Sequence, residues 1–275
     1  MPFTNLMRKD VKEKFPSWIE EGKEYQLCMS DDIDSWLSCC VLESVTGHEV
    51  NYFYSFDEFY VMDSEGQKEA IGVDIALMKG KCWDNHVTML SRRDSVNEQS
   101  ANLNAVFKIS RDNYTEKWAG STLLLVWSYY DLPLPESEEG KMLLLTIDST
   151  YKGHYMSKFK ETQNAYLRML DMEELIEVQE QHSQRDFQKI STKYRIKEKI
   201  KVNDGNLETE LMLEEIGEIL GFDLSLPQWK FKLMKKFENV VIDLNKKRMR
   251  YKLGIKDDVF SLALTSQLKL KYSSM

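Results

Sequence analysis

Glycine, proline and long apolar runs are all scarce in this chain. Its 275 residues include only 12 glycines and 5 prolines, while 42% are hydrophobic and 30% are charged. This composition excludes collagen-like, low-complexity and wholly disordered proteins, and it leaves enough apolar residues to bury a large core. The longest uncharged apolar run, Trp118 to Tyr130, is too short to span a bilayer. Because the first residues hold no apolar stretch of signal-peptide length, we expect a soluble, cytoplasmic protein that does not contact membranes.

Cysteine is also scarce, and its four positions show no metal-binding or redox spacing. They are Cys28, Cys39, Cys40 and Cys82. Without a C-x-x-C pair, zinc ribbons and thioredoxin-like redox sites are excluded. We therefore expect four reduced thiols, buried as small apolar side chains.

Basic residues are in deficit, and the deficit falls on one half of the chain. The formal net charge is −8. Residues 1–155 hold 15 basic and 26 acidic side chains, whereas residues 156–275 hold 22 basic and 19 acidic ones. An acidic surface repels phosphate groups unless bound divalent cations reverse the local field. The charge distribution is a first indication of a cation site, although a merely solvated acidic surface has the same signature.

The first half of the chain alternates short apolar runs with helical patterns. The expected strands cover residues 25–28, 50–54, 70–74 and 81–84. The expected helices begin near Ser35, with Asp34 or Ser35 as the N-cap, and cover residues 100–107 and 114–130. Residues 140–147 are helical or extended. This alternation predicts an α/β fold over residues 24–155, with a mainly parallel sheet flanked by helices.

The composition shifts near residue 155, which divides the chain into an expected domain 1–155 and an extension 156–275. The extension has a mixed helical and β-hairpin pattern. Its expected elements are an amphipathic helix at 159–184, a basic segment at 189–201, a helix at 207–220 ended by Gly221, and a strand pair at 240–244 and 259–264. Because the extension is slightly basic, we expect it to flank or close over the acidic half, where it would complement a phosphate substrate.

Acidic residues stand at the carboxyl ends of the expected strands. They are Asp32 and Asp34 after the first strand, Asp74 in the third, Asp84 with His86 after the fourth, and Asp148 after residues 142–147. In a parallel sheet these ends meet at one edge. A single Asp in such a place is more often a helix cap or a turn former, but four strand ends carrying acids are hard to obtain from turns alone.

Carboxylates gathered at one edge repel each other unless a cation neutralises them. Aspartates with one histidine suit oxygen-preferring ions such as Mn²⁺ or Mg²⁺. Two such ions, about 3.5–4 Å apart, are a common device for phosphodiester hydrolysis. The sequence therefore predicts a two-metal site.

Four short motifs resemble those of the DHH phosphoesterases. The segment from Cys28 to Ser35 (CMSDDIDS) resembles the first motif, and Ile71 to Asp74 (IGVD) resembles the second. Asp84-Asn85-His86 is similar to the Asp-His-His signature, with Asn85 in place of the central histidine. Leu145 to Ser149 (LTIDS) resembles the fourth motif. The resemblance covers residues 24–155, and the glycine-rich motif of the family's second domain is missing from the sequence.

The resemblance implies a manganese-dependent hydrolase of the RecJ or nano-RNase type, acting on nucleotides or short single-stranded nucleic acid. It implies that the metals, Mn²⁺ or Mg²⁺, are held by Asp32, Asp34, Asp74 and Asp148, with Asn85 as a weaker ligand. It also implies that His86 contacts the scissile phosphate or assists proton transfer. The alternative is a catalytically silent relative that binds a nucleotide or a protein partner, which Asn85 favours. Self-association is also left open.

Two further residues lie close to Asp148 in the sequence. Lys152 and His154 are candidate substrate contacts, because a positive group there would complement the phosphoryl group. Both are otherwise ordinary loop residues. Gly120-Ser121-Thr122 is interpreted as a point of close helix packing, since no P-loop pattern accompanies it.

Overall fold

The computed structural model describes residues 7–245 and 258–275. Seven strands form a mixed sheet in the order β6-β5-β4-β1-β2-β3-β9. Their bounds are β1 Gln26–Ser30, β2 Glu49–Tyr54, β3 Glu58–Val61, β4 Ala70–Val73, β5 Lys81–Trp83, β6 Ser100–Ala101 and β9 Lys232–Lys236. The pairs from β6 to β2 are parallel, while β3 and β9 are antiparallel additions at one edge. The predicted α/β class and mainly parallel sheet are confirmed.

Strand β1 is buried on both faces, as expected of a central parallel strand. Leu27 and Met29 belong to the main core, whereas Cys28 belongs to a separate cluster that includes Tyr54. This division follows the two-residue period of strand side chains. All four cysteines are free and buried, as the sequence predicted.

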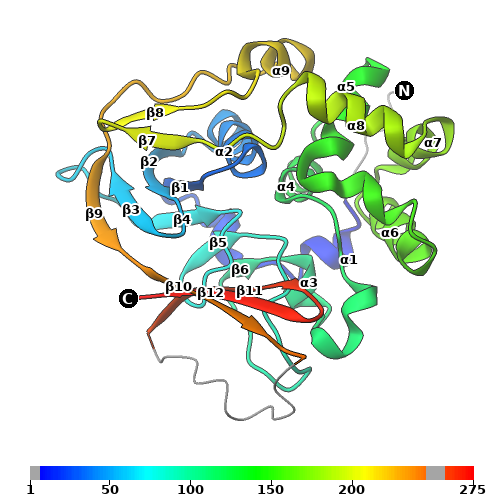
Figure 1. Cartoon of the computed structure of the whole chain (residues 1–275), viewed down its shortest axis with the longest axis horizontal. Helices are drawn as coiled ribbons and strands as arrows, with labels where there is room; N and C mark the ends of the chain where they lie inside the picture. Colours follow the sequence, from blue (N-terminus) through cyan, green and yellow to red (C-terminus); the bar gives the residue numbers. More distant parts are fainter. Residues whose placement is uncertain (1–6, 246–257) are drawn as a thin grey trace.

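Helices cover the sheet and extend to one side of it (Figure 1). Helix α2 packs against β1, β2 and β4, and α5 to α8 gather in a bundle away from the sheet. The helices of the first half are α1 Lys9–Lys12, η1 Ser17–Glu20, α2 Ile33–Thr46, α3 Leu103–Val106, η2 Arg111–Glu116, α4 Thr122–Tyr129, α5 Glu138–Thr146 and η3 Ile147–Gly153. Those of the second half are α6 Ser157–Met169, α7 Glu173–Gln181, α8 Gln184–Lys193 and α9 Leu213–Leu220. Among the described residues, no helix combines the length and apolar character needed to cross a membrane.

Several sequence-based boundaries are wrong. The N-cap of α2 is Asp32, whose side chain accepts from the Ser35 N–H, rather than Asp34 or Ser35. The single helix expected at 159–184 is two helices, separated at Asp171, which has a left-handed φ of 55°. The helix expected at 207–220 starts only at Leu213, because a hairpin of β7 (Lys201–Asn203) and β8 (Asn206–Glu208) precedes it. It does end at Gly221, whose φ of 76° gives the predicted left-handed cap.

The two expected helices of residues 100–130 are also shorter than predicted. The first begins as strand β6 and leaves only one turn of helix in α3. The second is divided into η2 and α4, with residues 117–121 as the connection. Ser121 caps α4 through its side chain, which accepts from the Leu124 N–H.

A second sheet is built by the end of the chain. Its order is β10-β12-β11, with bounds Glu238–Asp243, Lys269–Ser274 and Val259–Ser266. The expected pair, 240–244 and 259–264, is therefore not adjacent, because both strands pair with the unpredicted β12. The lysines and arginines of residues 246–251, which the sequence predicts to form a basic turn between these strands, lie outside the described residues.

The C-terminal sheet is attached to the loops that follow β4 and β5. Leu262 N–H donates to the Ala76 carbonyl (3.0 Å), and Leu264 N–H donates to the Val87 carbonyl (2.8 Å). Both loops leave the carboxyl ends of their strands, so this sheet lies over the edge at which the acids were expected (Figure 1). The prediction that the extension closes over the acidic edge is confirmed for this part of it.

The composition shift at residue 155 leaves no break in the hydrophobic core. Leu37 and Leu145 belong to the same cluster as Leu167 and Phe187 from the second half. The second half thus packs on the first as a continuous body.

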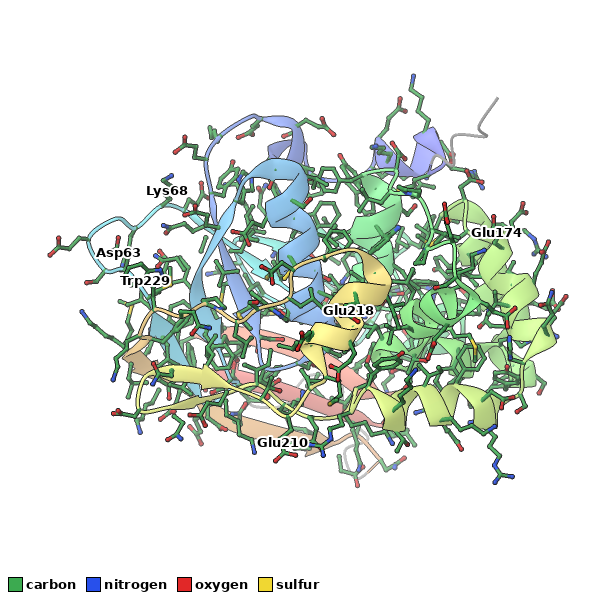
Figure 2. All side chains as sticks on the ribbon, turned by 90° about the horizontal axis from the view of Figure 1, so that it is seen from above. Asp63, Lys68, Glu174, Glu210, Glu218 and Trp229 are labelled. Carbon is green, nitrogen blue, oxygen red and sulfur yellow. The ribbon has the colours of Figure 1, made fainter. Side chains whose placement is uncertain are left out.

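At the surface, the loop from β3 to β4, which carries Asp63 and Lys68, projects from the body of the molecule (Figure 2).

Candidate metal centre

The acid-bearing strand ends meet where the order of the sheet reverses. From β1 the chain passes to β2 on one side and then returns to β4 on the other. Ligands of open α/β sheets bind at such a switch point, outside the carboxyl ends of the strands. Asp32 follows β1 and Asp74 follows β4, so the two residues flank this point.

Asp34 and Asp74 are brought together by the first turn of α4. Both oxygens of Asp34 accept backbone hydrogen bonds, from Thr122 N–H (2.9 Å) and Leu123 N–H (2.8 Å). The Thr122 hydroxyl donates to Asp74 Oδ1 at 2.8 Å. Because one residue contacts both carboxylates, the predicted proximity of Asp34 and Asp74 is confirmed.

His86 is oriented by a fully buried carboxylate. Its Nδ1 lies 2.7 Å from Asp84 Oδ1 and 3.9 Å from Asp74 Oδ1. Asn102 fixes this arrangement, since its amide donates to Asp84 Oδ2 and to the His86 carbonyl, each at 2.8 Å. With Nδ1 turned to Asp84, Nε2 is the ring nitrogen left to bind a ligand, as in carboxylate–histidine–metal arrangements.

Asn85 and Asp148 complete the cluster from another direction. The Asn85 amide donates to the Gly120 carbonyl (2.7 Å) and to Asp148 Oδ2 (3.2 Å). Asp148 was expected at the end of a strand, but residues 138–146 form helix α5 and Asp148 lies in η3, which follows it. It reaches the site from the helical bundle instead of the sheet edge.

Two of these acids have unusual backbone conformations. Asp74 has a φ of 56° and Asp148 a φ of 48°. Aspartate tolerates the left-handed region better than most residues, but it is disfavoured there. Such conformations concentrate at functional sites, where the surrounding structure holds a side chain in a required direction.

Burial and mutual repulsion raise the pKa of the central acids. Burial, followed by the charges of the neighbouring aspartates, raises the pKa of Asp34 well above its usual range. The same causes raise the pKa of Asp74 to about 8, and burial raises that of Asp148. Burial acts to lower the pKa of His86, but Asp84, Asp74 and Asp148 outweigh it and raise the value to about 10. In the absence of a cation, the surroundings therefore favour the protonated form of these acids over the charged form.

A lysine from the second half reaches the rim of the cluster. Lys199 Nζ lies 2.9 Å from Asp31 Oδ1 and 3.1 Å from Asp32 Oδ2. The adjacent Ile200 N–H donates to the Asp31 carbonyl at 2.8 Å. The segment after α8 is therefore tied to the loop after β1.

A cleft of about 220 Å³ opens between the acids and the C-terminal sheet. Asp32, Asp74 and His86 are among the residues that line it. The other residues that line the cleft are Phe56, Ala76, Lys199, Asn239, Ser261, Leu262, Ala263, Thr265, Lys271 and Tyr272. The site is thus shared between the acidic sheet edge and the extension.

Lys152 and His154 lie elsewhere. Lys152 lines a different cavity, together with Tyr151 and Arg195. His154 is only 6% exposed, and its Nδ1 has no hydrogen-bond partner in the described part of the chain. Neither residue is among those that line the cleft.

Three contributors to the site were not recognised in the sequence. Thr122 holds two of the acids, Asn102 holds Asp84, and Lys117 lies close enough to Asp148 for its charge to offset part of the effect of burial. The Gly-Ser-Thr before an apolar run was a detectable signal for the first of them, because it marks a helix N-terminus. Its interpretation as a packing point was incomplete.

The donor set fits a divalent cation. Ligand atoms of Asp74, Asp84 and His86 lie within 4.8 Å of one another. Asp32 and Asp148 act electrostatically on Asp74, which places further carboxylates around the same point. Carboxylate oxygens with one imidazole suit Mn²⁺ or Mg²⁺. Because Asp84 Oδ1 is already the hydrogen-bond partner of His86, Asp84 orients the imidazole, and the other carboxylates are the better candidates for direct ligands.

Comparison with known proteins identifies no relative. No family model matches the chain, no curated protein matches it, and no solved structure matches it either.

Proposed function

We propose that the protein is a metal-dependent phosphodiesterase of the DHH type, acting on nucleotides or short single-stranded nucleic acid. The observation that carries this proposal is the meeting of acids from β1, β4, β5 and η3 at one buried switch point, with His86 beside them. Such a concentration of buried charge is costly without a cation.

Asp32, Asp74 and Asp148 would hold two Mn²⁺ or Mg²⁺ ions, with Asp34 and Asn85 as further oxygen donors. When bound, the ions activate water and stabilise charge on the phosphoryl group. Asp34 also fixes the start of α4, because both of its oxygens accept backbone N–H groups. Its contribution to an ion would therefore use the remaining lone pairs.

His86 would act on the substrate directly. Asp84 holds its Nδ1, so the imidazole is fixed in orientation and presents Nε2. His86 lines the cleft with a side chain that is 34% exposed, which gives a phosphate access to it. From this position Nε2 would donate to the scissile phosphate or pass a proton to the leaving group.

A second candidate function is a catalytically silent binder of a nucleotide or a protein partner. The contact from the Asn85 amide to Asp148 favours it. A neutral amide donor satisfies part of the Asp148 carboxylate without any cation, which is what loss of a metal ligand would require. Both candidate functions use the cleft, and they differ in whether the bound ligand is cleaved.

Two measurements separate them. The metal content of the protein as purified shows whether the centre holds an ion. Incubation with Mn²⁺ and bis(p-nitrophenyl) phosphate shows whether a phosphodiester is cleaved. We expect bound Mn²⁺ or Mg²⁺ and turnover that disappears with a chelator. Absence of both would leave the silent binder as the better account.

A further inference from the structure

The cleft is lined by groups of both charges. Asp32, Asp74 and His86 line it together with Lys199 and Lys271 of the extension. A scissile phosphate belongs beside the acids, under the proposed function, because the metals would be there. The lysines are then left for another part of the substrate.

The two lysines differ in what already neutralises them. Lys199 is paired with both Asp31 and Asp32. Lys271, on β12, makes no ion pair with any residue of 7–245 or 258–275, and its ammonium lies 4.3 Å from the centre of the Phe56 ring. The charge of Lys271 also acts on Asp31, but the two groups form no ion pair. An ammonium group that lines the cleft, contacts an aromatic face and has no ion-pair partner there can bind an anion.

Phe56, which makes this contact, has a disfavoured backbone conformation. It lies in the short loop between β2 and β3 with a φ of 70°, where glycine is the usual residue. The Asn239 side chain donates to the Phe56 carbonyl at 3.0 Å and so attaches the loop to β10. A bulky residue in the left-handed region costs stability, so its presence beside Lys271 points to a functional contact.

The size of the cleft limits what can bind. At about 220 Å³ it lies below the roughly 300–1,000 Å³ of pockets that enclose a whole drug-sized ligand. Part of a nucleotide matches this volume, and the acids and lysines that line the cleft favour its charged part. The bases would then extend toward solvent, with little contribution to recognition.

We propose that Lys271, positioned by Phe56, binds a second phosphate of the substrate, next to the scissile one. The substrate is then a short nucleotide with at least two phosphate groups, and this inference rests on the proposed function. The second phosphate is either a terminal monophosphate or the next internucleotide linkage, and both offer the same oxygen acceptors to an ammonium group.

The test compares four thymidine substrates in the presence of Mn²⁺. They are the dinucleotide with one internal phosphodiester, its 5′-phosphorylated form, its 3′-phosphorylated form, and the trinucleotide. We expect at least one of the last three to show a kcat/KM about tenfold or more above that of the bare dinucleotide, as a charge-assisted hydrogen bond would give. Which of them is preferred identifies the source of the second phosphate.

Variants assign the preference to a side chain. Lys271→Met should reduce the ratio of kcat/KM between the phosphorylated substrate and the bare dinucleotide to about one, and Lys271→Arg should retain the preference. Phe56→Leu should reduce the preference by raising KM rather than lowering kcat, because it keeps the charge of Lys271 but removes the aromatic ring that positions it. Lys269→Met is the matched control, since Lys269 is an exposed lysine of the same strand that does not line the cleft.

A binding measurement keeps this inference separate from the proposed function. Calorimetry with Mn²⁺ compares thymidine 3′,5′-bisphosphate with the two thymidine monophosphates, and the bisphosphate should bind about tenfold tighter to the parent but not to Lys271→Met. If no substrate is cleaved and this difference persists, the second-phosphate site stands and the hydrolase proposal fails. If substrates are cleaved without preference, and Lys271→Met changes neither rate nor affinity, the inference is wrong.

Discussion

The Thr122 hydroxyl donates a 2.8 Å hydrogen bond to Asp74, although 48 positions separate the two residues in the sequence. The N–H of the same threonine donates to Asp34. The first residue of α4 therefore connects the acid that follows β4 to the acid at the start of α2. The relative position of these two carboxylates depends on where α4 begins, and Ser121 fixes this point as its N-cap.

Thr122→Val should weaken the proposed metal site without disrupting the fold. Valine has nearly the same shape but cannot donate to Asp74, and the lost buried hydrogen bond should lower the free energy of unfolding by about 1–3 kcal/mol. Mn²⁺ should then stabilise the variant less than the parent, because Asp74 is less well oriented. Thermal melts with and without Mn²⁺ measure both effects.

Thr146→Val is the matched control for that experiment. Thr146 is equally buried, and its hydroxyl donates only to the Met142 carbonyl within its own helix. That carbonyl keeps its helical partner after the substitution, so the loss should be smaller. The Mn²⁺-dependent shift in melting temperature should equal that of the parent. A reduced shift in Thr146→Val would show that the effect of Thr122→Val does not depend on the contact between Thr122 and Asp74.

Asp74→Asn should abolish both turnover and the stabilisation by Mn²⁺. The substitution removes a carboxyl group that must be ionised to bind a cation, and whose pKa Asp32 and Asp148 help to raise in the metal-free protein. Without metal, relief of repulsion should leave the melting temperature unchanged or raise it by roughly 2–4 °C, equivalent to about 1 kcal/mol. Asp10→Asn, at an exposed ion pair with Arg8, should change neither quantity. A full Mn²⁺-dependent shift in Asp74→Asn would contradict the proposed metal site.

Stability of the metal-free protein should fall as the pH rises from about 4 to about 8. The pKa of Asp74 is about 8 in the folded state, against about 3.9 in an unfolded chain. Between these values the folded state binds more protons, so the free energy of unfolding decreases with rising pH. The raised pKa of His86 acts in the same direction above about 6.5.

Asp74→Asn isolates the contribution of that carboxyl group. Its melting temperature should fall less steeply than that of the parent over the same pH range. Saturating Mn²⁺ should reverse the trend in the parent, because metal binding requires deprotonated carboxylates. Parallel pH profiles for the parent and the variant would show that Asp74 ionises normally.

The parts of this site that the sequence predicted are those fixed by local pattern. Asp32, Asp74 and Asp84 each follow an apolar strand, and parallel strands bring such positions to one edge without further information. The class of fold followed from the same alternation. These inferences needed only the period of the apolar residues and the position of an acid after them.

The parts that were missed depend on contacts between distant segments. Asp148 was placed after a strand because LLLTI is apolar enough for either element, and only its packing in the bundle makes it helical. β12, which supplies Lys271 and Tyr272 to the cleft, was not predicted. It is held there by pairing with β11, whose Leu264 N–H donates to the Val87 carbonyl. No local pattern records that Lys199 lies beside Asp32, 167 positions away.

Asn85→His is the substitution that best separates the two candidate functions. Asn85 is 7% exposed and donates to both Gly120 and Asp148, so a larger ring that satisfies only one of them should destabilise the metal-free protein. If the centre is a hydrolase site, the imidazole is a better Mn²⁺ ligand than an amide oxygen. Affinity measured by calorimetry should then rise, and each tenfold gain adds about 1.4 kcal/mol of stabilisation at saturating Mn²⁺. Asn85→Gln controls for size, since it crowds the same space but retains the amide. In a silent binder both variants should melt earlier and neither should gain stability from Mn²⁺, because the Asn85 amide would already have replaced the cation beside Asp148.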